Sequence, residues 1–211
     1  VIIRQVLAAV QMSGDGGIVR LEGRVSVNGA PARKGTPVKA GDAVVTASGG
    51  SAVFVVGKDA FLIREKSRLE IVGAGLAVTA LRMLSGKLLS VFGAGGRRIH
   101  TATATIGIRG TGIYVESEPE LSYICTCYGT ADLQATAMPE ARETVVTRHH
   151  DAPRYIHAHG DSPIKMIEQA PVVNHTDQEL IMLEALVDRV PPFVGKEGEY
   201  GLPGASLRGG Y

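Results

Sequence analysis

The sequence predicts an all-β protein with a short helical extension at its C-terminal end. Turn signals rich in Gly, Asn, Asp and Pro recur about every eight to twelve residues, and the runs between them are rich in β-branched residues. The alternating run Arg24–Val27 ends in Asn28-Gly29, a dipeptide typical of a tight hairpin turn. The 211 residues are 45% hydrophobic, which is enough for one large β domain or two small ones.

The charge balance and composition exclude several classes of partner. The chain has 22 Lys and Arg against 21 Asp and Glu, so it lacks the basic stripe that binds nucleic acid. Trp is absent and aromatic residues make up 5%, which argues against a base-stacking surface. The apolar stretch Val1–Val10 is too short to cross a bilayer and lacks a basic start, so we expect no transmembrane or targeting segment. A start at Val1 is compatible with a cleaved signal peptide.

Short strands are expected from Arg24 onward. They cover residues 24–27, 43–47, 52–56, 61–64, 67–72 and 101–115, the last as two strands joined by a turn at Arg109-Gly110. The sequence also contains an internal repeat, because Gly23-Arg-Val-Ser-Val is similar to Gly86-Lys-Leu-Leu-Ser-Val, which begins 63 residues later. We interpret the repeat as two related halves of one β domain, each of which buries its apolar face against the other.

A series of motifs in fixed order resembles a known family. The motifs are Gly23-x-Val25…Gly29, Val38-x-x-Gly41-Asp42-x-x-x-Thr46, Ala52-x-Phe54, Leu62-x-x-Glu65-x-Ser67-x-Leu69, Gly86-Lys-Leu-Leu-Ser-Val91 and Thr101-x-x-Ala104-x-x-Gly107-Ile-Arg-Gly110-Thr111. Over roughly residues 23–129 they resemble the FecR domain, the extracytoplasmic domain of ferric-citrate-type signalling regulators. The resemblance implies an all-β, β-helix-like or solenoid-like fold of two similar halves. It also implies export, so we expect a periplasmic or extracellular location.

The chain departs from the full-length regulators of that family. Those proteins begin with a cytoplasmic helical segment that binds a sigma factor, followed by a transmembrane helix. They often end in a small domain that docks an outer-membrane transporter. We find no counterpart of these segments in the sequence, and we therefore expect a standalone FecR-like scaffold rather than a sigma-factor regulator.

Four regions follow from these patterns. They are an N-terminal extension at residues 1–22, the FecR-like β domain at 23–137, a region at 138–175 that supplies partners for the cysteines, and a helix with a glycine-rich tail at 176–211. By composition the tail from Gly195 to Tyr211 is a linker, with six glycines and almost no apolar periodicity. We expect it to bind protein subunits, in a homo-oligomer or a larger complex.

The helix of the last region has a clear start signal. Thr176-Asp-Gln-Glu179 is a capping box, and it opens a predicted helix over residues 180–190. The apolar residues that would share one face of this helix are Leu180, Leu183, Val187 and Val190. Pro191-Pro192 is expected to end it.

Both cysteines of the chain, Cys125 and Cys127, lie in the predicted strand 121–128. Residues i and i+2 of a strand point to the same face, about 6.6 Å apart at Cα, so both thiols belong to one surface. Two adjacent histidines, His149 and His150, follow Cys127 after 21 residues. Two thiolates and two imidazoles suit a zinc ion, and they also match the ligands of a mixed Cys/His [2Fe–2S] centre.

The pairing of these cysteines with histidines leaves alternatives. Adjacent histidines on a regular strand point to opposite faces, so His149 and His150 can both bind only at a turn or a bulge. If one of them does not bind, His157 or His159 could replace it, because this i, i+2 pair shares a face. The remaining histidines, His100 and His175, are interpreted as surface or helix-flanking residues.

Other roles for the cysteines stay open: a strained disulfide, a buried structural pair, a redox-active thiol pair or a catalytic Cys–His pair. An exposed histidine could also ligate a haem held by another chain. Hydrolase motifs such as Gly-x-Ser-x-Gly and His-Glu-x-x-His are absent, so we expect no enzyme.

The sequence therefore favours an exported, non-enzymatic FecR-like scaffold with a Cys/His metal site, which binds other subunits through its C-terminal extension. One alternative is a periplasmic redox or electron-transfer protein with an iron–sulfur centre at the same residues. Another is a purely structural subunit of a larger assembly.

Overall fold

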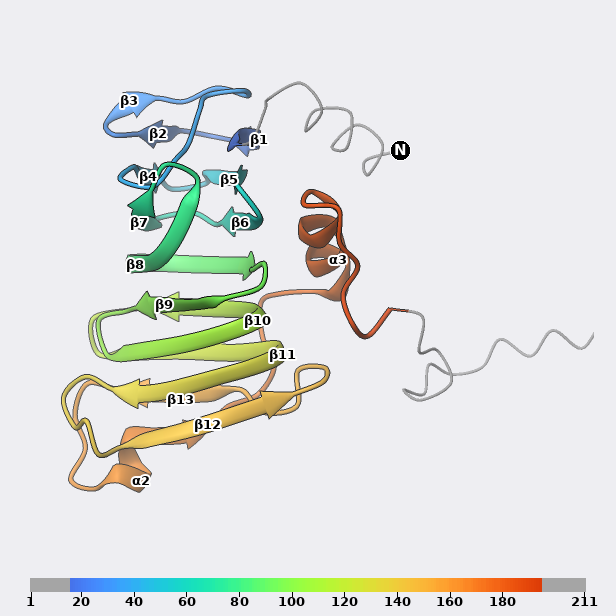
Figure 1. The fold of residues 1–211 in the computed structure, drawn as a ribbon. Helices are drawn as coiled ribbons and strands as arrows, with labels where there is room; N and C mark the ends of the chain where they lie inside the picture. The colour runs from blue at the N-terminus through green and yellow to red at the C-terminus, as the bar shows by residue number, and fades with distance from the viewer. Residues whose placement is uncertain (1–15, 195–211) are drawn as a thin grey trace, which may run out of the picture.

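The computed structural model describes residues 16–194, which form a tall stack of strands with a helix against one side (Figure 1). Fourteen strands belong to one continuous sheet. They are β1 (Gly16–Glu22), β2 (Val25–Val27), β3 (Ala30–Pro31), β4 (Ala43–Thr46), β5 (Ser51–Val56), β6 (Asp59–Ile63), β7 (Arg68–Ala74), β8 (Ala77–Val91), β9 (Gly96–His100), β10 (Ala104–Ser117), β11 (Leu121–Ala135), β12 (Arg142–Thr147), β13 (Arg154–His157) and β14 (Ile167–Gln169). The helices are α2 (Pro163–Met166) and α3 (Asp177–Ala185). The predicted all-β class with a C-terminal helical extension is confirmed.

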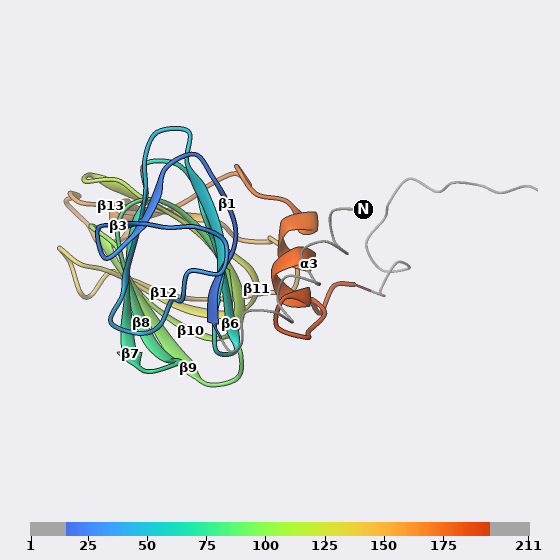
Figure 2. The ribbon, with the colours of Figure 1, turned by 90° about the horizontal axis from the view of Figure 1, so that it is seen from above.

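The sheet folds back on itself into two faces, because the long strands β8, β10 and β11 run from one face to the other. The first part of β10 pairs with β9, whereas its last part pairs with the end of β8. We call one side the helix face; it comprises β1, β5, β6, β13, β14 and residues 88–91, 112–117 and 121–128 of the long strands. We call the other side the open face; it comprises β2, β3, β4, β7, β9, β12 and residues 77–85, 104–109 and 129–135. Figure 2 shows both faces seen along the stack, with α3 outside the helix face.

Glycines allow the long strands to change face. Gly86 in β8 and Gly129 in β11 have φ values of +89° and +93°, which side-chain-bearing residues rarely adopt. A Cβ atom on Gly86 would lie 2.3 Å from the Ser67 hydroxyl oxygen, so a larger residue does not fit there. The two glycines of the internal repeat, Gly23 and Gly86, both lie where the chain passes from one face to the other. Gly23 joins β1 on the helix face to β2 on the open face. The predicted turn at Arg109-Gly110 is likewise a corner within the single strand β10.

Strand alternation divides the buried side chains into two layers. On β5, Phe54 and Val56 point into the space between the two faces, where they join the main core. Val53 and Val55 point outward from the helix face into a second apolar layer. Three leucines of the C-terminal segment cover this second layer, namely Leu180, Leu183 and Leu186. The helix face is therefore buried on both sides.

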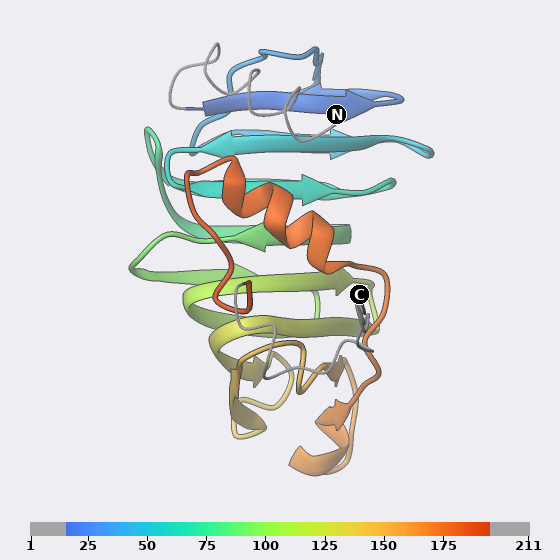
Figure 3. The ribbon, with the colours of Figure 1, turned by 90° about the vertical axis from the view of Figure 1, so that its right-hand side faces the viewer.

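The helix α3 lies across the strands of the helix face and contacts β6 and β8 (Figure 3). It begins with the predicted capping box, in which the Thr176 hydroxyl accepts from the Glu179 N–H and the Glu179 carboxylate accepts from the Thr176 N–H. The prediction that the helix continues to residue 190 is wrong, because α3 ends at Ala185 and Asp188 has a φ of +55°. Val190 is consequently 69% exposed, and Leu186 is buried instead.

The predicted boundaries differ from the structure at the N-terminal end. Gly16–Glu22, part of the expected N-terminal extension, forms β1, which pairs with β5 over six residue pairs. Buried Ile18 and Val19 explain its place in the sheet. Residues 1–15 and the glycine-rich tail at 195–211 lie outside the described residues, as does the predicted subunit contact of that tail. Within residues 16–194, neither helix is long and apolar enough to span a membrane.

Candidate metal centre

The two cysteines lie on the outer side of the helix face, beneath the C-terminal segment. β11 carries them, and its alternation sends Ile124 into the main core while Cys125 and Cys127 enter the outer layer. Both thiols are free, and both residues have no exposed surface. The strand period therefore places the two sulfur atoms on one surface that water does not reach.

His150 reaches this surface from the loop between β12 and β13. Its φ of +54° turns the chain back over β11, and its N–H donates to the carbonyl oxygen of Cys127 at 3.0 Å. The Asp151 carboxylate holds the turn by accepting from the Arg148 N–H at 3.0 Å. As a result, Nδ1 of His150 lies 3.5 Å from Sγ of Cys125. The turn thus brings one of the two adjacent histidines, His150, to the sulfur atoms.

His175 reaches the same surface from the linker that precedes α3. Its Nε2 lies 3.0 Å from Nδ1 of His150, and its ring stacks on Tyr114 with centroids 4.6 Å apart. On the other side of the ring, Nδ1 lies 2.6 Å from the carbonyl oxygen of Val173. Because Thr176 caps α3 directly after His175, the start of the helix fixes the position of this ring.

The hydrogen-bond partners of the two rings determine where their protons lie. A carbonyl oxygen only accepts, so Nδ1 of His175 must donate to Val173. Nε2 of His150 must likewise donate to Asp177, whose Oδ1 lies 3.0 Å away. In neutral rings the two nitrogens that face each other at 3.0 Å are then both acceptors. Two lone pairs at this distance repel, so the arrangement is stable with a metal ion between the two nitrogens, or with a proton there, which the neighbouring Cys125 thiol can supply.

The four ligand atoms of Cys125, Cys127, His150 and His175 all lie within 4.8 Å of one another. In a tetrahedral zinc site with metal–sulfur bonds near 2.3 Å and metal–nitrogen bonds near 2.0 Å, the ligand atoms are about 3.3–3.8 Å apart. To reach this geometry, the two ring nitrogens at 3.0 Å would separate slightly and the wider pairs of ligand atoms would move closer together. The arrangement can therefore hold one tetrahedral ion with two sulfur and two nitrogen ligands.

The electrostatic environment of Cys125 and Cys127 favours one thiolate and one thiol. The hydrogen bond from Cys127 lowers the pKa of Cys125 to about 4, with help from His150 and His175 and against the effect of burial. Burial raises the pKa of Cys127 well above its usual range. One sulfur is thus already in the form that binds metals, and a metal ion would displace the proton from the other.

Asp177 forms a second layer behind the ligands. It is the first residue of α3, where the positive end of the helix dipole favours a carboxylate. Its Oδ1 accepts from Nε2 of His150 at 3.0 Å and from Nε2 of His149 at 2.8 Å. Burial raises the pKa of this carboxyl, but the two histidines outweigh it and lower the pKa overall. A carboxylate behind a ligating histidine orients the ring and strengthens its metal bond.

The structure brings together only part of the predicted ligand set. His149 is grouped with His150 and Asp177 instead of with the sulfurs, and its ring lies against Phe193 with centroids 4.5 Å apart. The two alternative ligands lie elsewhere, because Nε2 of His157 is 3.3 Å from Glu168 and Nε2 of His159 is 3.3 Å from Glu120.

Sequence reasoning missed His175 and Asp177. The capping box is the sequence signal that could have pointed to them, because it places His175 and Asp177 directly before and after Thr176 at the start of a helix. The sequence does not show which strands that helix covers.

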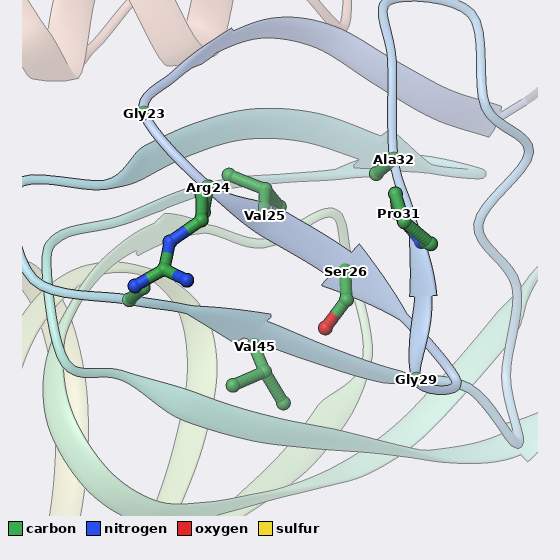
Figure 4. Close-up of a pocket in the computed structure, with 9 residues that line it drawn as sticks. Gly23, Arg24, Val25, Ser26, Gly29, Pro31, Ala32 and Val45 are labelled. Atoms are coloured by element: carbon green, nitrogen blue, oxygen red, sulfur yellow. The ribbon is translucent and has the colours of Figure 1, made fainter.

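A hollow of about 480 Å³ lies at the N-terminal end of the stack, between β2, β3 and β4 (Figure 4). Arg24 is the one charged residue that lines it, and most of the others are small or apolar. Ser26 offers a hydroxyl group, but the lining residues include no histidine or carboxylate that could act as its base, so this hollow does not form a reactive site.

Comparison with known proteins gives a limited result. No family model and no curated protein match the chain. Two crystal structures of a putative anti-sigma factor from Parabacteroides distasonis ATCC 8503, at 1.65 Å and 2.50 Å resolution, are similar in fold. Each is 12% identical with a TM-score of 0.48, and each match covers 61% of this chain and 58% of the other protein. The chain thus matches less than two thirds of that protein, and a likeness of this size transfers no residue role.

Proposed function

We propose that the chain is a non-enzymatic, FecR-like scaffold that holds one metal ion through Cys125, Cys127, His150 and His175. The observation that supports the proposal most strongly is the pair of facing ring nitrogens, 3.0 Å apart beside a thiolate. The metal ion would join β11, the β12–β13 loop and the linker before α3, which are distant in sequence. Its role in this proposal is to fix the C-terminal segment on the helix face.

The donor set favours zinc. Two thiolates and two imidazoles form a closed set of four ligands, which is typical of structural zinc sites. Soft sulfur ligands disfavour Mg²⁺ and Ca²⁺, which prefer oxygen. Burial of both cysteines leaves no open position for a substrate, which agrees with a structural role.

A [2Fe–2S] cluster is the second candidate, since its ligands can also be two cysteines and two histidines. Its two irons and bridging sulfides would lie between two separate pairs of ligands. The four ligand atoms here lie within 4.8 Å of one another, so the space between them suits a single ion better.

Elemental analysis combined with an absorption spectrum tests the proposal. Protein purified without oxygen or chelators should contain close to one zinc per chain and should show no visible absorption. His150→Ala and His175→Ala should both lower the zinc content, whereas His157→Ala and His159→Ala should retain it. A visible band that bleaches on reduction would favour the cluster. Protein that contains neither iron nor zinc as purified, and that stays metal-free after incubation with zinc, would contradict both assignments.

A further inference from the structure

A second hollow of about 480 Å³ lies on the open face, across β9, β10, β11 and β12. Gly107 of β10 forms part of its lining, between its neighbours Arg98 on β9 and Asp132 on β11. Gly107 lacks a side chain, and the atom closest to a Cβ built there, in Asp132, would be 3.7 Å away. The missing side chain therefore leaves open space within a row of polar residues.

Two arginines line this hollow from opposite sides. Arg98 comes from β9, and Arg142 comes from the edge strand β12, opposite Gln134 of β11. Thr105 lies between them on β10 and offers a hydroxyl group. Both arginines are exposed, so their guanidinium groups can turn toward a ligand in the hollow.

The acidic residues around the hollow already have cationic partners. Asp132 pairs with Arg109 at 2.8 Å, and Glu143 pairs with Arg154 at 2.6 Å. Within residues 16–194, Arg98 and Arg142 make no ion pair. Two positive charges therefore stay available beside the hollow.

His100, beside the hollow, lies close to the charges of two arginines. His100 lies on β9 two residues after Arg98, opposite Arg82 of β8. Burial lowers the pKa of His100, and the charges of Arg82 and Arg98 lower it further. The contribution of the two arginines, unlike that of burial, agrees with a positive charge on this side of the hollow.

We propose that the hollow around Gly107 binds an oxyanion group, a carboxylate or a phosphate, between Arg98 and Arg142. A guanidinium group matches the two oxygens of such a group through parallel hydrogen bonds. Because the hollow is open to solvent, binding is weak and decreases with salt. This site is separate from the metal centre, which lies on the opposite face of the sheet.

Calorimetric titration of the full chain with inorganic phosphate, and separately with succinate, tests the proposal at low ionic strength. At least one anion should bind with a Kd on the order of 1 mM, and the better ligand identifies the class of oxyanion. Arg98→Gln and Arg142→Gln should each weaken binding on the order of tenfold. Gly107→Leu should weaken it to a similar degree, because it fills the hollow and keeps both arginines.

Arg33→Gln is the matched control, because it removes the same charge from an exposed position in the loop between β3 and β4. Its affinity should equal that of the wild type. Equal weakening by Arg33→Gln and Arg98→Gln would show an effect of net charge alone and would overturn the proposal. Wild-type affinity in Gly107→Leu, or no binding of either anion at 20 mM, would also overturn it. Thermal unfolding of each variant confirms that it is folded.

Discussion

The helix face and the open face share three long strands, yet their outer surfaces differ in chemistry. On β11 the outward residues of the helix face are Cys125 and Cys127, and after the corner at Gly129 those of the open face are Asp132 and Gln134. The first pair is fully buried beneath the C-terminal segment, whereas the second pair is partly exposed. A single strand thus contributes to a closed site and to an open one.

The difference shows how a cover changes the chemistry of a sheet surface. Under α3 and its linker, water is excluded, so hydrogen bonds and charges shift pKa values strongly and few groups determine the arrangement. On the open face, solvent screens the charges, and each ion pair contributes little. Metal removal and matched substitutions should therefore have larger effects on the helix face than on the open face.

Removal of the metal should have the largest effect. With free zinc at about 1,000 times its Kd, binding would stabilise the folded chain by about 4 kcal/mol. A strong chelator should remove this contribution and lower the midpoint of urea unfolding. Cys127→Ser should start near the lower midpoint and should not respond to chelator. Identical midpoints with and without chelator in the wild type would contradict a stabilising metal.

The second largest difference should come from shortening a leucine side chain on each face. Leu183→Ala removes a fully buried side chain of α3 and should lower the free energy of unfolding by about 3 kcal/mol. Leu84→Ala on the open face removes a side chain that is 48% exposed, and its effect should stay within about 0.5 kcal/mol. Urea unfolding measures both. Equal costs would show that α3 does not cover the helix face in solution.

Asp177→Asn should weaken the metal centre without removing a ligand. Loss of the carboxylate behind His150 is expected to lower metal affinity by about 10–100-fold. Competition with a chelator of known affinity measures the change. Asp161→Asn is the control, because Asp161 is exposed and pairs with Lys165 at 2.9 Å, away from the ligands. An unchanged affinity in Asp177→Asn would remove Asp177 from the site.

Ion pairs should give the smallest difference between the faces. Arg64 donates to Glu179 and to the carbonyl oxygen of Asn174, and its side chain is 31% exposed. Arg64→Gln should therefore cost about 1 kcal/mol. On the open face, Arg109 is 64% exposed, so Arg109→Gln should cost about 0.3 kcal/mol. Double-mutant cycles with Glu179→Gln and Asp132→Asn measure the two couplings, and a stronger coupling on the open face would reverse the comparison.

The sequence predicted features that depend on local pattern. The spacing of Cys125 and Cys127 placed both thiols on one face of a strand, and the capping box located the start of α3. Turn signals and β-branched runs identified the all-β class. Each of these depends on residues within a few positions of one another.

Features that depend on packing between distant segments could not be predicted. Whether His149, His150, His157 or His159 meets the cysteines depends on the path of the β12–β13 loop and on the register of β13 against β11. His175 approaches them because α3 packs on the helix face, which no short motif encodes. The early end of α3 follows from the left-handed conformation of Asp188 rather than from the prolines that come later.

X-ray absorption spectroscopy at the metal edge of the purified protein tests the central claim most directly. The proposed centre predicts two sulfur ligands at about 2.3 Å and two nitrogen ligands at about 2.0 Å around a single zinc ion. His175→Ala should lose one of the nitrogen ligands, and His149→Ala should keep both. A coordination shell of nitrogen and oxygen without sulfur would contradict the proposed centre, as would a second metal ion at short distance.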